Sequence, residues 1–293
     1  MNWWKFDVLK RVCHTYVIFT DRSIIVESSE ERDSQTRILE NNLTSRAKSY
    51  FVVLAVLLGF STVAAQADGA KQDAKAIEVM KQMAAFKSSQ DQVVIKGVTF
   101  TDARLGAGLM VSNAEEVSVS IKRPGSMLIT SADGKATRGF YFHDGLFTFF
   151  NSASQLYGQA DIPKDIEAAM EFALDELGIE APLMDMIYQD AAAHLLSSDE
   201  TILYLTDKAR VGGTDCHHIA IRGSDIDIQL WVEEGDRPMT RRIMITSKWE
   251  GGSPRFLADL DWDTNPQFAP GFFEFKAPEG ATKIDFIRGA SAQ

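Results

Sequence analysis

The sequence predicts an α+β domain in which a strongly curved antiparallel sheet forms a half-open β-barrel. A helical insert and an N-terminal helix are expected to cover the mouth of this barrel. Two series of strand patterns, at 91–150 and from 201 onward, are separated by a helical segment at 163–196. About ten consecutive antiparallel strands curl strongly under their own twist, and helices then gather on one face. These observations together predict the fold class.

The clearest strand pattern lies in 225–233. Its apolar residues alternate with polar ones, which is typical of a strand with one buried and one wet face. The apolar set is Ile226, Ile228, Leu230 and Val232, and the polar set includes Asp225, Asp227, Gln229 and Glu233. The neighbouring strands carry similar sets: Ile243 and Ile245; Phe256, Ala258, Leu260 and Trp262; and His217, Ile219 and Ile221. A sheet of this kind needs another layer against its apolar face.

The segment 50–60 is an uncharged apolar run that follows Arg46 and Lys48 and precedes the small-residue sequence ending at Ala67. This order is that of a secretory signal peptide, and we expect cleavage after Ala67 to leave Asp68 as the new N-terminus. The alternative is a membrane anchor, but the run is far shorter than the ~20 residues of a spanning helix. Residues 1–45 show no strand pattern and are interpreted as an extended leader or a mis-assigned start, with a short cytoplasmic tail on an uncleaved anchor as the alternative.

Charge and cysteine content limit the possible partners. The leader to residue 67 holds 8 of the 30 basic and 7 of the 41 acidic residues, which leaves 22 against 34 and a mature charge of −12. Such a charge disfavours nucleic acid and anionic membrane surfaces as partners. Only Cys216 remains after cleavage, so no internal disulfide is expected. We expect one periplasmic domain over 68–293, a monomer with no cofactor.

The elements of this domain follow in order. A helix is predicted at 71–86, because Ile77, Met80, Met83 and Ala84 recur at helical spacing. Strands are predicted at 91–104, 109–122, 126–132, 137–143 and 146–150. Asp144-Gly145 marks a hairpin between the last two.

A helical insert comes next. Pro163 suits a first helical turn, Gly178 suits the end of the helix, and one face is formed by Ile166, Met170, Ala173 and Leu177. Two short helical turns are expected at 183–188 and 191–196. Strands then continue from 201 to 275, and a short tail ends near Ile287.

Five segments carry a resemblance to a known family. They are 121–124 (IKRP), 140–145 (FYFHDG), 183–188 (LMDMIY), 213–220 (GTDCHHIA) and 230–233 (LWVE). Over roughly 71–287 the chain resembles the bacterial periplasmic family called domain of unknown function 2092, which is similar to the LolA-like lipoprotein carriers. The resemblance implies an incomplete barrel lidded by helices around an apolar cavity, and a lipid or lipoprotein acyl chain as partner. No cavity residue of the characterised carriers can be matched to this chain individually.

Methionines adapt to irregular apolar partners and the strands opposite are rich in aromatic residues, so the insert and the sheet could hold an acyl chain. From the residues alone, the alternative that the same side chains simply fill the core is favoured. The resemblance implies an apolar ligand cavity under the insert. The predicted cavity residues are Phe140, Phe142, Met170, Leu174, Met184, Ile187, Ile226, Ile228, Leu230, Ile243, Ile245, Phe256, Leu260 and Trp262.

Sites for covalent or metal chemistry are sparse. Cys216, His217 and His218, with His143 and His194, are the soft ligands of the mature chain. Without a bulge, alternation along a strand lets at most two of the three adjacent residues share a metal. It also separates the backbones of Cys216 and His218 by about 6.5–7 Å, which is too far for a nucleophile and its base.

The carboxylates of one strand give no stronger signal. Asp259, Asp261 and Asp263 alternate with apolar residues and are interpreted as a solvated outer face. Three functions remain. A carrier of a lipid or other apolar ligand is favoured over an envelope scaffold that acts through a protein partner, and a metal-dependent enzyme at Cys216 and His218 is a distant third.

Overall fold

The computed structural model describes residues 15–19, 23–28, 72–105, 108–179, 181–189, 195–196, 201–249 and 251–286. The strands are β1 (Thr15–Phe19), β2 (Ser23–Ser28), β3 (Gln92–Arg104), β4 (Met110–Lys122), β5 (Ser126–Ala132), β6 (Thr137–His143), β7 (Leu146–Asn151), β8 (Leu156–Asp161), β9 (Thr201–Val211), β10 (Thr214–Arg222), β11 (Ile226–Glu233), β12 (Thr240–Ser247), β13 (Arg255–Asp263) and β14 (Thr282–Phe286). The helices are α3 (Ala74–Ser88), α4 (Ile166–Leu177) and α5 (Met184–Ile187).

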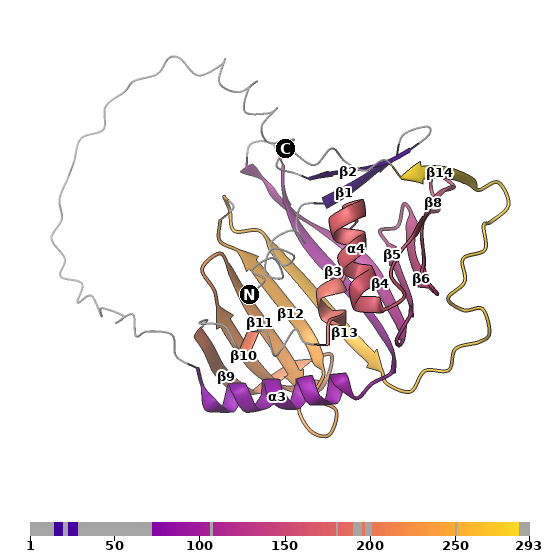
Figure 1. Ribbon diagram of the computed structural model, residues 1–293. Coiled ribbons are helices and arrows are strands. Elements are labelled where there is room, and N and C mark those ends of the chain that lie inside the picture. Colours follow the sequence, from indigo (N-terminus) through magenta and orange to yellow (C-terminus); the bar gives the residue numbers. More distant parts are fainter. Residues whose placement is uncertain are drawn as a thin grey trace, which may run out of the picture.

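The strands form one open sheet of fourteen strands in the order β1-β2-β14-β8-β7-β6-β5-β4-β3-β13-β12-β11-β10-β9 (Figure 1). All neighbours from β8 to β9 in this order pair antiparallel, whereas β14 is parallel to both β8 and β2. The sheet does not close, because β1 and β9 lie at its ends in the described part of the chain. The predicted antiparallel architecture is thus confirmed as an open sheet.

Two meanders meet at a seam between β3 and β13. Strands β3–β8 and β9–β13 are each consecutive in sequence, and the pairing of β13 with β3 joins them from Phe256↔Thr101 to Asp263↔Val94. Gly97 lies opposite Leu260 on this seam, and a Cβ atom at position 97 would come within 2.1 Å of the carbonyl oxygen of Asp259. Only glycine allows the two backbones to approach this closely.

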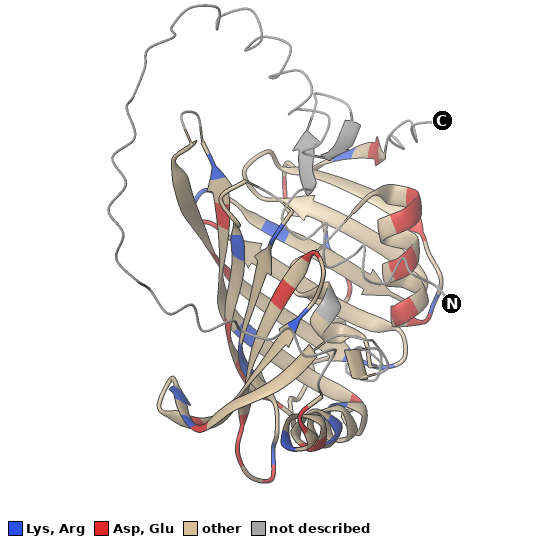
Figure 2. Cartoon of the chain, turned by 90° about the vertical axis from the view of Figure 1, so that its left-hand side faces the viewer, with Lys and Arg blue, Asp and Glu red and all other residues tan. Residues whose placement is uncertain are grey.

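Helices α3, α4 and α5 lie on one side of the sheet, which we call the inner face; the opposite side is the outer face (Figures 1 and 2). Helix α3 begins at Ala74, where the Asp73 carboxylate accepts hydrogen bonds from the amides of Lys75 and Ala76. Of the residues predicted for its apolar face, Met80 and Met83 are buried, whereas Ile77 and Ala84 are half-buried.

Helix α4 confirms its sequence pattern. Ile166, Met170, Ala173 and Leu177 are all buried, and Gly178 ends the helix with a φ of 63°. Figure 2 shows acidic residues along the side of α4 that is turned away from the sheet. The predicted turn at 183–188 is present as α5, whereas residues 191–194 lie outside the described part of the chain.

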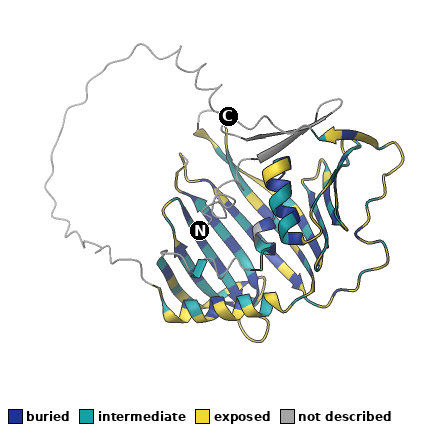
Figure 3. Cartoon of the chain, in the orientation of Figure 1, coloured by how far each residue is buried: buried dark blue, intermediate teal, exposed yellow. Residues whose placement is uncertain are grey.

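The alternating strands bury the predicted side. Strand β11 alternates strictly between buried and half-buried residues, with Ile226, Ile228, Leu230 and Val232 buried. The same alternation continues along the neighbouring strands (Figure 3).

Three expectations are corrected. The structure forms β1 and β2 within 1–45, where no strand was expected, and it adds β8 and β14. The strands predicted to continue to 275 end at Asp263, and 264–281 form turns and irregular chain. Pro266, Pro270 and Pro278 interrupt this segment, and proline cannot donate to a strand ladder. The leader run 50–60, the cleavage pair Ala67 and Asp68, and Ile287 lie outside the described residues.

Candidate functional site

The predicted cavity residues gather on the inner face. All fourteen are buried, and all except Leu174 belong to one apolar cluster that includes residues of α4, α5 and both meanders. Neighbouring strands align them in rows, such as Ile228 opposite Ile245 and Leu230 opposite Ile243. A packed core and a ligand-lined cavity both produce such burial, so their role as cavity residues stays a prediction.

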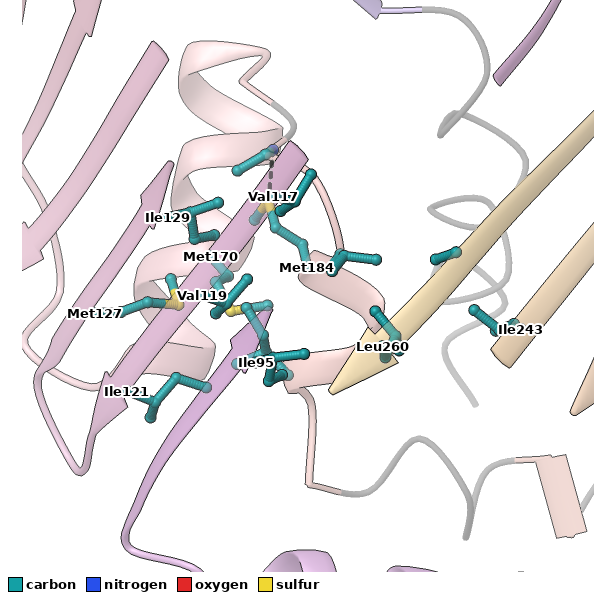
Figure 4. Packing of buried hydrophobic residues seen from close by; sticks show 14 of the residues in the cluster. Ile95, Val117, Val119, Ile121, Met127, Ile129, Met170, Met184, Ile243 and Leu260 are labelled. Atoms are coloured by element: carbon teal, nitrogen blue, oxygen red, sulfur yellow. Dashed lines mark hydrogen bonds between the residues drawn. The ribbon is translucent and has the colours of Figure 1, made fainter. Parts of the chain in front are cut away.

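Helix α5 connects the two halves of this cluster. In Figure 4, Met170 of α4 faces Val119, Met127 and Ile129, whereas Met184 of α5 lies between Val117 on β4 and Leu260 on β13. The thioether of Met184 also accepts a hydrogen bond from the Ala181 amide at 2.9 Å. The insert predicted to be rich in methionine therefore places flexible side chains where the two meanders meet.

Two polar contacts hold the C-terminal end of α5, and a third holds Arg123, the donor of one of them, to α4; we call these three contacts the α5 clamp. Arg123 donates from Nη1 to Glu167 of α4 at 2.6 Å and from Nη2 to the carbonyl of Ile187 at 2.9 Å. Lys87 of α3 donates to the carbonyl of Tyr188 at 2.7 Å. Cations at a helix C-terminus satisfy free carbonyl groups and complement the helix dipole. At the other end, Leu183 adopts a φ of 63° and gives no side-chain cap.

Aromatic residues fill the inner face of β6 and β7. Phe140 packs on Phe149 and Phe142 on Phe147, with ring centroids 4.9 and 4.8 Å apart. On the outer face of the same strands, Phe275 from the segment 264–281 contacts Tyr141, Phe150 and Tyr157. The burial that results raises the pKa of Tyr141 above its ordinary value.

The side chains of Cys216, His217 and His218 contact different partners and do not share a site. His217 Nδ1 lies 2.8 Å from the Tyr204 hydroxyl, whereas His218 stacks on Trp231 at 4.2 Å and its Nε2 lies 3.0 Å from Gln229 Oε1. On β6, His143 Nδ1 lies 2.9 Å from the Ser126 hydroxyl of β5. His194 lies outside the described residues, within which no three His, Cys, Asp or Glu side chains come together as metal ligands.

We predict that Cys216 has a structural role. Its side chain is fully buried, its thiol lies 3.5 Å from the Thr214 carbonyl, and burial raises its pKa. Changing Cys216 to Ser is expected to lower the free energy of unfolding by about 1 kcal/mol, measured by urea denaturation, because a more polar hydroxyl replaces the thiol. Loss of a stoichiometric metal from this variant, detected by elemental analysis, would show instead that the thiol is a ligand.

The outer face carries a hollow of about 370 Å³ that the sequence did not predict. It is lined by Phe100, Asp102, Ser112, Arg242, Met244, Arg255, Leu257 and Asp259. We call it the outer hollow. Among these residues, alternation had assigned Asp259 to a solvated face. The register across β4, β3, β13 and β12 shows that the eight residues lie next to one another.

Two ion pairs flank the apolar floor of the outer hollow. Arg242 makes a two-point contact with Asp259, which raises the pKa of the guanidinium. Asp102 accepts hydrogen bonds from the Ser112 hydroxyl and from the backbone and side chain of Arg255. Burial by itself would raise the pKa of Asp102, but the hydrogen bonds and the Arg255 charge together lower it.

No helix of the described residues is long and apolar enough to cross a membrane. No curated protein matches the sequence. Solved structures similar to the chain include LprF from Mycobacterium bovis, with 10% identity over 72% of this chain and 99% of that chain and a TM-score of 0.42. They also include the lipoprotein LppX from Mycobacterium tuberculosis, with 9% identity over 67% and 98% and a TM-score of 0.40. A LolA superfamily protein from Nitrosomonas europaea has 10% identity over 67% and 96% and a TM-score of 0.32. These scores are too low to support a statement about function.

A family profile covers most of the chain. It is described as "Predicted periplasmic protein (DUF2092)" and matches residues 76–287. The match includes the inner-face cluster from Ala76 to Ile284 and the whole outer hollow. It confirms the family resemblance and the periplasmic location that the sequence predicts. The chain belongs to the DUF2092 family of predicted periplasmic proteins.

Proposed function

We propose that the protein is a periplasmic carrier that holds a lipid, an acyl chain or another apolar ligand between the inner face of the sheet and the helices over its mouth. The carrier is the mature chain, residues 68–293, formed by cleavage between Ala67 and Asp68. Binding is reversible and involves no covalent step. The ligand lies against the predicted cavity residues, with Met170 and Met184 adapting to its shape.

The observation that carries this proposal is the width of the apolar inner face. A helix is ~10–12 Å across and strands lie ~4.8 Å apart, so one helix covers only two or three strands. Helix α4 faces β4 and β5, and α5 reaches β13, whereas α3 contacts β9 and, through Met83, Thr240 of β12. The apolar cluster also includes Ile243, Leu230 and Ile219 on β12, β11 and β10. The apolar face is therefore wider than α4 and α5 alone, which supports a role for a further apolar occupant beside α3.

The α5 clamp supports reversible access. The short helix carries one turn and depends on polar contacts from Arg123 and Lys87 at its C-terminal end. Local opening at α5 would separate these contacts and expose Met184 and Ile187, which is a smaller apolar surface than unfolding of a central strand would expose. A ligand could enter beside α5 while the sheet stays intact.

A scaffold function is the second candidate, and one observation favours it. Every predicted cavity residue is buried, with relative exposure from 0% at Met170 to 8% at Trp262. If these side chains fill the inner face by themselves, the protein binds no lipid and acts through an envelope partner. The two candidates differ in what accompanies the purified protein.

Native mass spectrometry of protein purified from the periplasm tests the proposal. We expect a second species heavier than the mature chain by the mass of a lipid or fatty acid, which disappears when the protein is denatured in organic solvent. The stripped and refolded protein, incubated with a lipid extract, should regain the same species. A mass of the mature chain alone in both samples would contradict the carrier and favour the scaffold.

A further inference from the structure

The outer hollow lies on the face of the sheet opposite to the helices, so it is separate from the inner-face cluster. Phe100 retains 38% of its surface exposed there. On β6, β7 and β8 the outer face is covered by Phe275, which contacts Tyr141, Phe150 and Tyr157. Phe100 is exposed, unlike those covered aromatic residues, and it lines the outer hollow.

The floor of the outer hollow is apolar and continuous. Met244 pairs with Leu257, and Leu257 pairs with Phe100, so three apolar side chains form one row across β12, β13 and β3. A volume of about 370 Å³ falls within the range of ~300–1,000 Å³ of small-molecule sites. Sites of this kind combine an apolar lining with a few well-placed polar groups.

The polar groups around this floor have satisfied acceptors and spare donors. Both oxygens of Asp259 accept from Arg242, and both oxygens of Asp102 accept from Ser112 or Arg255. In contrast, Arg255 makes its side-chain hydrogen bond through Nε, and neither of its Nη atoms has a partner among the described residues. Because the unused hydrogen-bonding capacity consists of cationic donors, the hollow suits an anion better than a cation.

The wall on the β12 side is held in place. His218 stacks on Trp231, and the Arg242 guanidinium lies 5.8 Å from the Trp231 ring while it binds Asp259. These four residues form one row across β10, β11, β12 and β13. The Arg255 side chain opposite is 58% exposed and can move toward a bound group. The outer hollow therefore has one guanidinium held in place, that of Arg242, and one that can move, that of Arg255.

We infer that the outer hollow is a second binding site, for a small amphiphilic anion whose alkyl chain ends in a carboxylate. The chain lies on Phe100, Leu257 and Met244, and the carboxylate accepts hydrogen bonds from the two Nη groups of Arg255. A guanidinium binds a carboxylate through two parallel hydrogen bonds. This site does not depend on the proposed inner-face function.

Octanoate is the probe, and the protein is labelled with ¹³C at its methionine methyl groups. We expect octanoate to shift the Met244 methyl signal, assigned from a Met244→Leu variant, at 0.15 M salt, where the Debye length of ~8 Å screens the net charge of the chain. The buried Met170 and Met184 report on the inner face instead, so the two sites are distinguished in one titration.

Arg255→Gln is expected to weaken octanoate binding at Met244 about tenfold, because two charge-assisted hydrogen bonds are lost. Arg222→Gln is the matched control, since Arg222 is an exposed arginine on β10 outside the hollow. This variant should bind octanoate as tightly as the unchanged protein does. Octanol, which has the same chain without the charge, should also bind about tenfold more weakly. No shift at Met244, or equal binding by Arg255→Gln or by octanol, would overturn the inference.

Discussion

Replacing Ile228 with tryptophan is expected to abolish capture of a fluorescent fatty acid while the free energy of unfolding changes by less than about 0.5 kcal/mol. Ile228 is buried on the inner face of β11, where it pairs with Ile245 and Ile221. If a ligand occupies the space above it, the larger ring fills that space and excludes the ligand without displacing protein atoms. Fluorescence titration and urea denaturation of the same variant measure the two quantities.

The scaffold candidate predicts a different outcome for Ile228→Trp. If protein side chains already fill this space, the indole must displace them, and overpacking costs about 1–3 kcal/mol. Thr246→Trp provides the control, because Thr246 is half-buried on the outer face of β12, directly after the inward-facing Ile245. The control should retain both ligand capture and stability. A large loss of stability by Ile228→Trp, in a protein that never binds the probe, would end the carrier proposal.

Replacing Arg123 with methionine is expected to lower the free energy of unfolding by about 2–3 kcal/mol, since it leaves partners of a charged donor without their hydrogen bonds. The side chain of Arg123 is only 13% exposed, and it connects Glu167 of α4 with the Ile187 carbonyl of α5. Hydrogen exchange should increase first in α5, at the Met186 amide that donates to Leu183. Urea denaturation and hydrogen exchange measure these effects.

Arg210→Met is the matched control for Arg123. Arg210 also combines an ion pair, to Asp215 at 3.0 Å, with a hydrogen bond to a carbonyl, that of Gly213. Its side chain is 66% exposed, and exposed ion pairs contribute about 0–1 kcal/mol. Equal effects of the two substitutions would mean that the α5 clamp contributes no more than an ordinary surface contact.

Much of the sheet was predictable because it is built from neighbouring strands with one apolar face. Asp144-Gly145 marked the β6–β7 hairpin, and the alternation of 225–233 gave the buried side of β11. Helix α4 was recognisable from its apolar face and from Gly178 at its end. In each case, local residues carry the information that determines the local structure.

The remainder depends on contacts that alternation does not encode. Strand β8 contains Gly158 and β14 has a single buried residue, Ile284, so neither gives a clear apolar period. Strand β14 forms by parallel pairing with β8, far away in the sequence. Strands were expected to continue to 275, but Phe275 instead packs across the outer face of β6–β8. The outer hollow was missed because it needs the register of four strands.

The seam between β3 and β13 also determines the order in which the protein can fold. Each meander joins strands that follow one another, so its loops close early at small entropic cost. The pairing of Val94 with Asp263 must wait until nearly the whole chain is available. Until then β3 presents an unpaired edge, with Gly97 leaving its backbone open to other strands. We therefore expect the seam to form late in folding, and the newly exported chain to be more prone to aggregation before it forms.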